Sequence, residues 1–168
     1  MRILGIDPGS RLTGVGIIEV RDDTVVPVCF GVIRAARGDA AKDFPLRLGH
    51  IFSALTDLVR EHGPAVAAVE TVFVSHNASS AIKLGQARGA AVCAVIHAGL
   101  EVAEYSPRSV KQAIVGRGGA DKVQVQHMVR VLLGLPEAPE EDAADALAVA
   151  LCHHHTRRTL DNMAGRGP

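Results

Sequence analysis

Four acidic residues stand out because each one ends or interrupts an apolar stretch. Asp7 ends the segment "RILGID", and Glu70 ends the segment "AVAAVE". Asp142 and Asp145 are spaced i, i+3 in "EEDAADALAVAL", so they share one face of a predicted helix. A buried, ionised carboxylate without a partner costs several kcal/mol. We therefore expect these side chains either to reach solvent at an edge of the fold or to meet positive charge there.

Clustered carboxylates repel one another, and bound protons or cations relieve that repulsion. Sites made only of oxygen ligands select hard cations such as Mg²⁺ or Mn²⁺. Two such ions about 4 Å apart can activate a water and stabilise a leaving oxygen in phosphodiester displacement. The four acids thus predict a site for two Mg²⁺ ions, with Mn²⁺ as an alternative. Taken singly, Asp7 also fits an Asp-Pro-Gly turn, and the Asp142–Asp145 pair fits a solvated helix face.

The order of apolar segments predicts an α/β fold with a mixed five-stranded sheet. The first three strands have short connections and form an antiparallel meander, whereas the later strands return through helices on both faces. If the first and fourth strands pair in parallel, Asp7 and Glu70 emerge at the carboxyl edge, where open α/β sheets bind ligands. This order is similar to that of ribonuclease H-like folds. The predicted strands are 2–7, 13–20, 25–33, 65–70 and 100–106, and the predicted helices are 43–63, 77–99, 107–115, 121–133 and 139–155.

Composition is that of an ordinary globular protein with one domain. The chain has 168 residues, 48% of them apolar, and a formal net charge of zero, which disfavours a uniformly basic polyanion binder. Residues 71–136 nevertheless hold seven Lys or Arg against three Asp or Glu. No apolar run is long enough for a membrane span, so we expect a cytoplasmic protein without a membrane partner. The domain is expected over 1–155, followed by a disordered tail over 156–168.

Two further features allow more than one interpretation. The predicted helix 77–99 carries a narrow face of small side chains that includes Gly85 and Gly89, suited either to packing on its own sheet or to a subunit interface. Three widely spaced cysteines have apolar neighbours, which favours buried thiols over disulfides. Cys152 precedes three histidines, but consecutive side chains on a helix point in different directions and suit a metal poorly.

Four segments resemble one family closely, the RuvC Holliday junction resolvases. They are "GIDPGSRLTGVGII", "VETVFVSHNASSAIKLGQARGA", "YSPRSVKQAIVGRGGADKVQVQHMVR" and "DAADALAVALCH", which together span most of residues 3–153. The resemblance implies a ribonuclease H-like fold and a homodimer. It also implies an endonuclease that makes paired, Mg²⁺-dependent nicks in four-way DNA junctions during recombination and repair, leaving 5′-phosphate and 3′-hydroxyl ends. Cooperation with the RuvA and RuvB branch-migration proteins is implied as well.

The resemblance also assigns roles to single residues. It implies that Asp7, Glu70, Asp142 and Asp145 are the catalytic metal ligands, and it places Lys111 and the catalytic Lys122 beside them. Phe73 matches an aromatic position that contacts junction bases. The expected DNA-binding residues are Phe73, Lys83, Arg88, Lys111, Arg117 and Lys122.

Three alternatives remain open at the level of sequence. An actin-like or sugar-kinase-like phosphotransferase also places Asp and Gly after a strand, but it generally needs a second domain and a second glycine-rich phosphate loop. A catalytically silent junction-binding protein would be expected to lose one of the four acids. A related nuclease could act on another branched or RNA-containing substrate.

Overall fold

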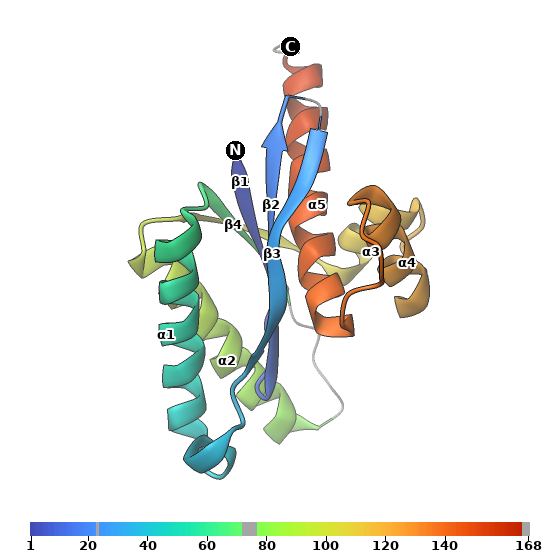
Figure 1. Ribbon diagram of the computed structural model, residues 1–168. Helices are drawn as coiled ribbons and strands as arrows, with labels where there is room; N and C mark the ends of the chain where they lie inside the picture. Colours follow the sequence, from blue (N-terminus) through green and yellow to red (C-terminus); the bar gives the residue numbers. More distant parts are fainter. Residues whose placement is uncertain (23, 72–76, 166–168) are drawn as a thin grey trace.

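A single mixed sheet lies between two layers of helices in the computed structural model (Figure 1), which describes residues 1–22, 24–71 and 77–165. The strand order is β3-β2-β1-β4-β5. Strands β1 and β2 pair antiparallel, as do β2 and β3, whereas β4 pairs parallel with both β1 and β5. The strands are β1 (Arg2–Asp7), β2 (Leu12–Arg21), β3 (Thr24–Arg34), β4 (Val66–Glu70) and β5 (Glu101–Tyr105).

The helices divide between the two faces of the sheet. Helices α1 and α2 cover one face, and α3, α4 and α5 cover the other (Figure 1). A short 3₁₀ helix, η1 (Gly38–Ala41), precedes α1 and was not predicted. The helices are α1 (Phe44–His62), α2 (Ala78–His97), α3 (Pro107–Val115), α4 (Lys122–Leu132) and α5 (Glu141–Met163).

Short polar side chains fix where several helices begin. Asp43, Asn77 and Ser106 each accept a hydrogen bond from a backbone N–H in the first turn of the helix that follows. Asp121 caps α4, and Gln124 closes a reciprocal capping box with it. Helix α1 ends at Gly63 in the left-handed conformation, with φ of 55°. These local signals explain why the predicted helices agree closely with the structure.

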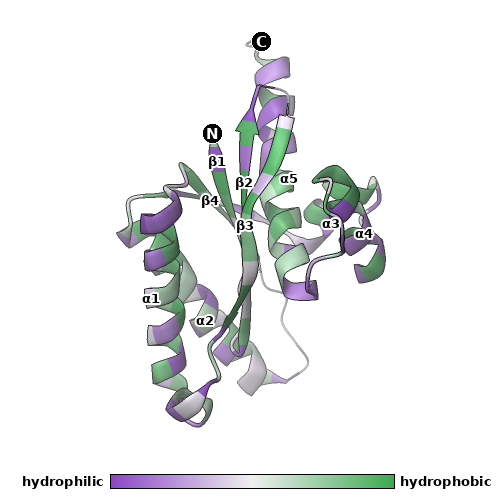
Figure 2. Ribbon diagram, in the orientation of Figure 1, coloured by the Kyte–Doolittle hydropathy of each residue, from purple (hydrophilic) through white to green (hydrophobic). Residues whose placement is uncertain are grey.

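The predicted α/β class and mixed sheet are confirmed, but two details of the prediction are wrong. Helix α5 continues to Met163, eight residues beyond the predicted helix end at residue 155. Figure 2 shows why the apolar pattern ends early, since the last turns of α5 are largely hydrophilic. Cys93 is exposed rather than buried, whereas Cys152 is buried. No helix in the described ranges is long and apolar enough to cross a membrane.

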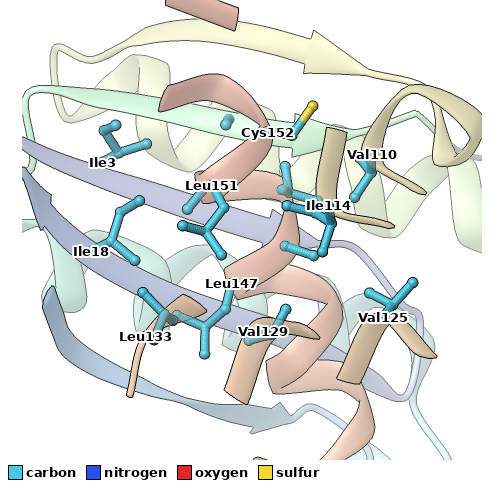
Figure 3. Close-up of a cluster of buried hydrophobic side chains, with 14 of the residues drawn as sticks. Ile3, Ile18, Val110, Ile114, Val125, Val129, Leu133, Leu147, Leu151 and Cys152 are labelled. Atoms are coloured by element: carbon cyan, nitrogen blue, oxygen red, sulfur yellow. The ribbon is translucent and has the colours of Figure 1, made fainter. Parts of the chain in front are cut away.

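Alternation along the strands builds a separate core on each face. On β1, Ile3 packs with α3, α4 and α5, whereas Leu4 and Ile6 pack with α1 and α2. Figure 3 shows the first of these cores, in which Leu147 and Leu151 of α5 lie over the sheet. The same alternation places Asp7 on the α5 side of the sheet, two residues beyond Gly5 and four beyond Ile3.

Candidate metal centre

Asp7 and Glu70 stand at the ends of neighbouring strands. Strands β1 and β4 run parallel, with Ile6 opposite Val69, and each strand ends at the next residue. Val66 and Ala68 face the α5 core, so Glu70 shares that face by the two-residue period of a strand. Both carboxylates therefore project at the carboxyl edge of the sheet and toward α5.

Glycines in the strands let α5 come close enough to bring its own acids to this edge. A Cβ on Gly5 would lie 2.0 Å from the backbone oxygen of Ala146, and one on Gly14 would lie 1.9 Å from that of Asp142. Gly14 pairs directly with Asp7 in the β1–β2 ladder. The backbone of α5 thus rests on the strand beside Asp7, which no larger residue at position 14 would permit.

The turn after Asp7 is held by a buried threonine. Thr13 is fully buried, and its hydroxyl donates to the carbonyl oxygen of Gly9 at 2.9 Å. The backbone N–H of Gly9 in turn donates to the Thr13 hydroxyl oxygen at 3.3 Å. These bonds close the "DPGS" turn tightly and fix the direction in which Asp7 leaves β1.

A cavity of about 280 Å³ opens where these elements meet. Three of the four predicted acids line it, together with both predicted lysines. Asp142 lies one helical turn before Asp145 on α5, near the cavity but outside its lining. The lining residues are Asp7, Glu70, Pro107, Val110, Lys111, Lys122, Val125 and Asp145.

Burial and mutual repulsion make these carboxylates reluctant to ionise. The pKa of Asp7 is raised by burial first, and then by the negative charges of Glu70 and the two α5 aspartates. Burial, followed by the charge of Asp145, also raises the pKa of Glu70. Burial also raises the pKa of Asp145, and the positive charge of Lys122 partly offsets this rise. A site that holds acids under such repulsion is prepared for a cation.

Lys122 is the cation nearest the acidic side chains of α5. Its ammonium group forms an ion pair with Glu141, and its Nζ lies 4.0 Å from an Asp145 carboxylate oxygen. The hydrogen bond to Glu141 is the first cause of the raised pKa of Lys122. Lys122 begins α4, whereas Lys111 reaches the cavity from α3. Both lysines therefore border the acids from the layer of helices that contains α5.

The donor set suits a hard divalent cation. All four candidate ligands are carboxylates, the oxygen donors that Mg²⁺ and Mn²⁺ prefer. Among the described residues, no three acidic, histidine or cysteine side chains yet converge in ligand geometry. Ion binding would therefore draw the carboxylates inward or use bridging water, as Mg²⁺ commonly does.

The remaining predicted DNA-binding residues are distributed over several elements. The Lys83 ammonium lies 6.0 Å from the ring centroid of Phe44, and Arg88 forms an ion pair with Glu104 of β5. Arg117 is exposed in the connection between α3 and α4, outside the lining of the acidic cavity. Phe73 lies outside the described residues.

Sequence reasoning missed the residues that bring α5 onto the sheet. Gly5, Gly14 and Gly16 alternate with apolar residues on β1 and β2, and glycine within a strand marks a close backbone approach. That signal was available in the sequence. Glu141 gave no such signal, because nothing local in the sequence predicts its partner Lys122.

A mixed sheet of this order with acids at its carboxyl edge defines the class of ribonuclease H-like nucleases. The family model described as "Crossover junction endodeoxyribonuclease RuvC" matches residues 3–153. A relative of that name from Pelobacter propionicus is 54% identical over 168 residues, which is 100% of this chain and 94% of the relative. One from Shewanella woodyi is 51% identical over 164 residues, covering 98% of this chain and 92% of the relative.

Comparison with solved structures supports the same family. The structure titled "T. thermophilus RuvC in complex with Holliday junction substrate" matches with a TM-score of 0.86 and 35% identity, covering 95% of this chain and 96% of that one. The yeast mitochondrial Holliday junction resolvase Ydc2 shares the fold, with a TM-score of 0.71 at 14% identity over 97% of this chain and 83% of that one. The chain belongs to the RuvC family of crossover junction endodeoxyribonucleases. Membership in this nuclease family implies metal-dependent hydrolysis of phosphodiester bonds.

Proposed function

We propose that this protein resolves Holliday junctions by paired nicks at a two-Mg²⁺ site formed by Asp7, Glu70, Asp142 and Asp145. The observation that carries the proposal is the grouping of Asp7, Glu70 and Asp145 around one cavity at the edge of the sheet, where burial and neighbouring acids raise the pKa of each. Bound Mg²⁺, with Mn²⁺ as a substitute, would supply the charge that activates water and stabilises the departing 3′ oxygen. The products then carry 5′-phosphate and 3′-hydroxyl ends.

The side chains around the cavity have distinct tasks in this proposal. The four carboxylates neutralise and hold the cations, and the two strand ends keep Asp7 and Glu70 at fixed positions. Lys122 borders Asp145 and is free at its exposed side to approach a phosphate, so its charge stabilises the transition state. Lys111 and the more distant Arg117 act mainly by binding phosphates. Phe73 is proposed to contact junction bases.

Paired resolution requires a homodimer, since two symmetric nicks need two sites related by a two-fold axis. Helix α2 supports this part of the proposal. Its buried side faces the core, whereas Ile82 and Ile96 are 64% and 57% exposed on the other side. Gly85 and Gly89 lie between them, and a Cβ at either glycine would meet nothing within 4 Å. Close packing against a second copy would cover this apolar face. We place the dimer in the bacterial cytoplasm, with RuvA and RuvB as partners.

Nicking of a synthetic four-way junction tests the metal site. With Mg²⁺, the wild-type protein is expected to nick the junction and to leave linear duplex intact. Asp7→Asn and Glu70→Gln should abolish nicking and retain junction binding, because removing negative charge eases the approach of phosphate. Asp161→Asn, an exposed position near the other end of α5, serves as the matched control and should nick normally. Normal nicking by either site variant would contradict the assigned site.

Substitution on α2 tests the dimer. Gly89→Leu should produce monomers that lose paired resolution, measured by analytical ultracentrifugation and by linear product formation. A Cβ at position 89 would meet nothing within 4 Å in the single chain, so folding should be preserved. Ser53→Leu on the exposed side of α1 is the matched control and should remain dimeric. A wild-type protein that stays monomeric at assay concentration and still resolves junctions would refute the proposed dimer.

A further inference from the structure

A second basic region lies at the carboxyl edge of the sheet, separate from the cavity that Lys111 and Lys122 line. It surrounds a hollow of about 370 Å³ in which three of the five lining residues are arginines. None of these arginines was among the predicted DNA-binding residues. The lining residues are Arg11, Leu12, Arg34, Ala36 and Arg37.

Two chain segments hold this hollow in place. Arg11 ends the turn after β1, and Arg34 is the last residue of β3, opposite Leu12 in the β2–β3 ladder. The backbone N–H of Ala35 donates to the carbonyl oxygen of Arg11 at 2.9 Å, which ties the two segments together beyond the ladder. The backbone positions of Arg11 and Arg34 are therefore fixed relative to each other and to the sheet.

The charge of this hollow is largely uncompensated. Arg11 and Arg37 are exposed, and within residues 1–22, 24–71 and 77–165 their side chains make no ion pair or hydrogen bond. Arg34 is different, because one of its guanidinium nitrogens donates to both carboxylate oxygens of Glu140, at 2.6 and 2.8 Å. No acidic residue lines the hollow.

An adjoining hollow extends the region along α1. It has a volume of about 520 Å³, shares Arg34 and Arg37, and adds His50, again without an acidic lining residue. Asp39 lies close in sequence but lines neither hollow. The chain has zero net charge, so a concave surface whose charged residues are all basic is a local feature that favours binding of an anion.

The position of the hollow relative to the acids indicates which anion it would bind. The sheet order places β3 two strands from β1, and neighbouring strands lie about 4.8 Å apart, so the hollow is about 10 Å from Asp7 along the edge. One DNA strand advances about 3.4 Å per nucleotide along the helix axis. A strand whose phosphate occupies the metal site would therefore present another phosphate at the hollow within a few nucleotides. Guanidinium groups bind phosphate oxygens through charge-assisted hydrogen bonds, which suits this region to the DNA backbone.

We propose that Arg11, Arg34 and Arg37 form a phosphate subsite for the junction strand that is cut, next to the acidic cavity that Lys111 and Lys122 line. The inference rests on the proposed function, since its ligand is the junction DNA. The subsite positions the strand along the carboxyl edge, so that the arginines and the two lysines together hold it over the acids. Its Arg34–Glu140 ion pair also joins the subsite to α5 two residues before Asp142.

The test compares the salt dependence of junction binding in two double variants. Arg11→Ala/Arg37→Ala removes both unpaired arginines, and Arg21→Ala/Arg60→Ala makes the same charge change at the opposite end of the fold, at side chains that are 69% and 76% exposed. Binding of a synthetic four-way junction is measured in EDTA over a range of NaCl concentrations. Each lost phosphate contact lowers the log–log slope by about 0.9, so the first variant should lose about 1.8. The control variant should retain the wild-type slope.

Single-turnover nicking in Mg²⁺ completes the experiment. With saturating protein, Arg11→Ala/Arg37→Ala should nick more slowly than wild type because the strand is no longer positioned over the acids, and subsaturating protein should show the loss of affinity as well. Arg21→Ala/Arg60→Ala should nick at the wild-type rate under both conditions. Equal slopes for wild type and Arg11→Ala/Arg37→Ala would overturn the subsite, as would an equal loss in the control. A wild-type protein that neither binds nor nicks the junction would refute the proposed function itself, which distinguishes the two failures.

Discussion

The two faces of the sheet are packed in different ways. On one face, α1 and α2 meet the sheet through a layer of larger apolar side chains, among them Leu4, Ile51 and Leu55, all fully buried. On the other face, α5 lies directly over strand glycines, and a Cβ on Gly14 would overlap its backbone. The first face stabilises the fold through apolar burial, whereas the second also sets the distance between the acids of α5 and those at the strand ends.

This difference separates stability from catalysis in the molecule. A side-chain layer can relax when one member is shortened, at a cost in free energy but with little change in backbone position. A helix in backbone contact with a strand has no such freedom, since any added atom moves the helix. Substitutions on the two faces should therefore affect nicking and unfolding in different proportions.

Among substitutions in the packing of the two faces, Gly14→Ala should reduce nicking the most. The added methyl group would force α5 away from β2, and overpacking of this kind costs about 1–3 kcal/mol or more. A shift of about 1 Å in catalytic groups can reduce a rate about 100-fold, so nicking should fall by at least that factor. Gly31→Ala in β3 is the matched control, because a Cβ there would meet nothing within 4 Å. Junction nicking by Gly14→Ala at the rate of the control would show that close packing of α5 does not set the site.

Leu55→Ala should affect the opposite face in the complementary way. Loss of this fully buried side chain should lower the free energy of unfolding by about 2–5 kcal/mol, measured by urea denaturation. At a temperature where the variant remains folded, its nicking rate with saturating Mg²⁺ should stay close to that of wild type. A large loss of rate without unfolding would mean that the α1–α2 face also positions the acids.

In the metal-free protein, Asp7→Asn should raise the folding stability, a smaller change than that of Leu55→Ala and in the opposite direction. Burial and neighbouring acids raise the pKa of Asp7 above its value in the unfolded chain, so the native state binds more protons between the two values. Stability therefore falls as pH rises through that window, and the substitution should remove part of this loss. At pH 8 in EDTA, Asp7→Asn should melt a few degrees higher than wild type, because about 1 kcal/mol shifts Tm by about 2–4 °C.

The control for this prediction is the same comparison near pH 4. Below the raised pKa, wild-type Asp7 is protonated in the native state and carries no charge to repel its neighbours. The difference in Tm should therefore shrink as pH falls. A lower Tm for Asp7→Asn at pH 8 would contradict the account of electrostatic strain at this site.

Much of the fold could be predicted because local signals agree with the tertiary structure. Strand β1 ends at Asp7 as predicted, and the helix predicted over 77–99 is present as α2, capped by Asn77. The continuation of α5 was missed because its last turns, including Arg157 and Arg158, lack an apolar face on which a periodicity could be read. Helix formation there depends on continuation from a buried helix rather than on a local pattern.

The site was predictable in type but not in detail. Clustered acids at strand ends and on one helix face predict a metal centre, because their spacing and chemistry are readable in one dimension. The pairing of Lys122 with Glu141, and of Arg34 with Glu140, joins residues far apart in the chain. The exposed hollow around Arg11 likewise depends on the β2–β3 ladder, which brings distant arginines together.

The most direct test of the central claim is a crystal of this protein soaked in MnCl₂ and measured at a wavelength where manganese scatters anomalously. The account predicts two anomalous peaks about 4 Å apart between the carboxylates of Asp7, Glu70, Asp142 and Asp145. The same soak of Asp7→Asn crystals should lose at least one peak. Manganese bound elsewhere, for example at His153–His155, with these four carboxylates left without metal, would contradict the assignment.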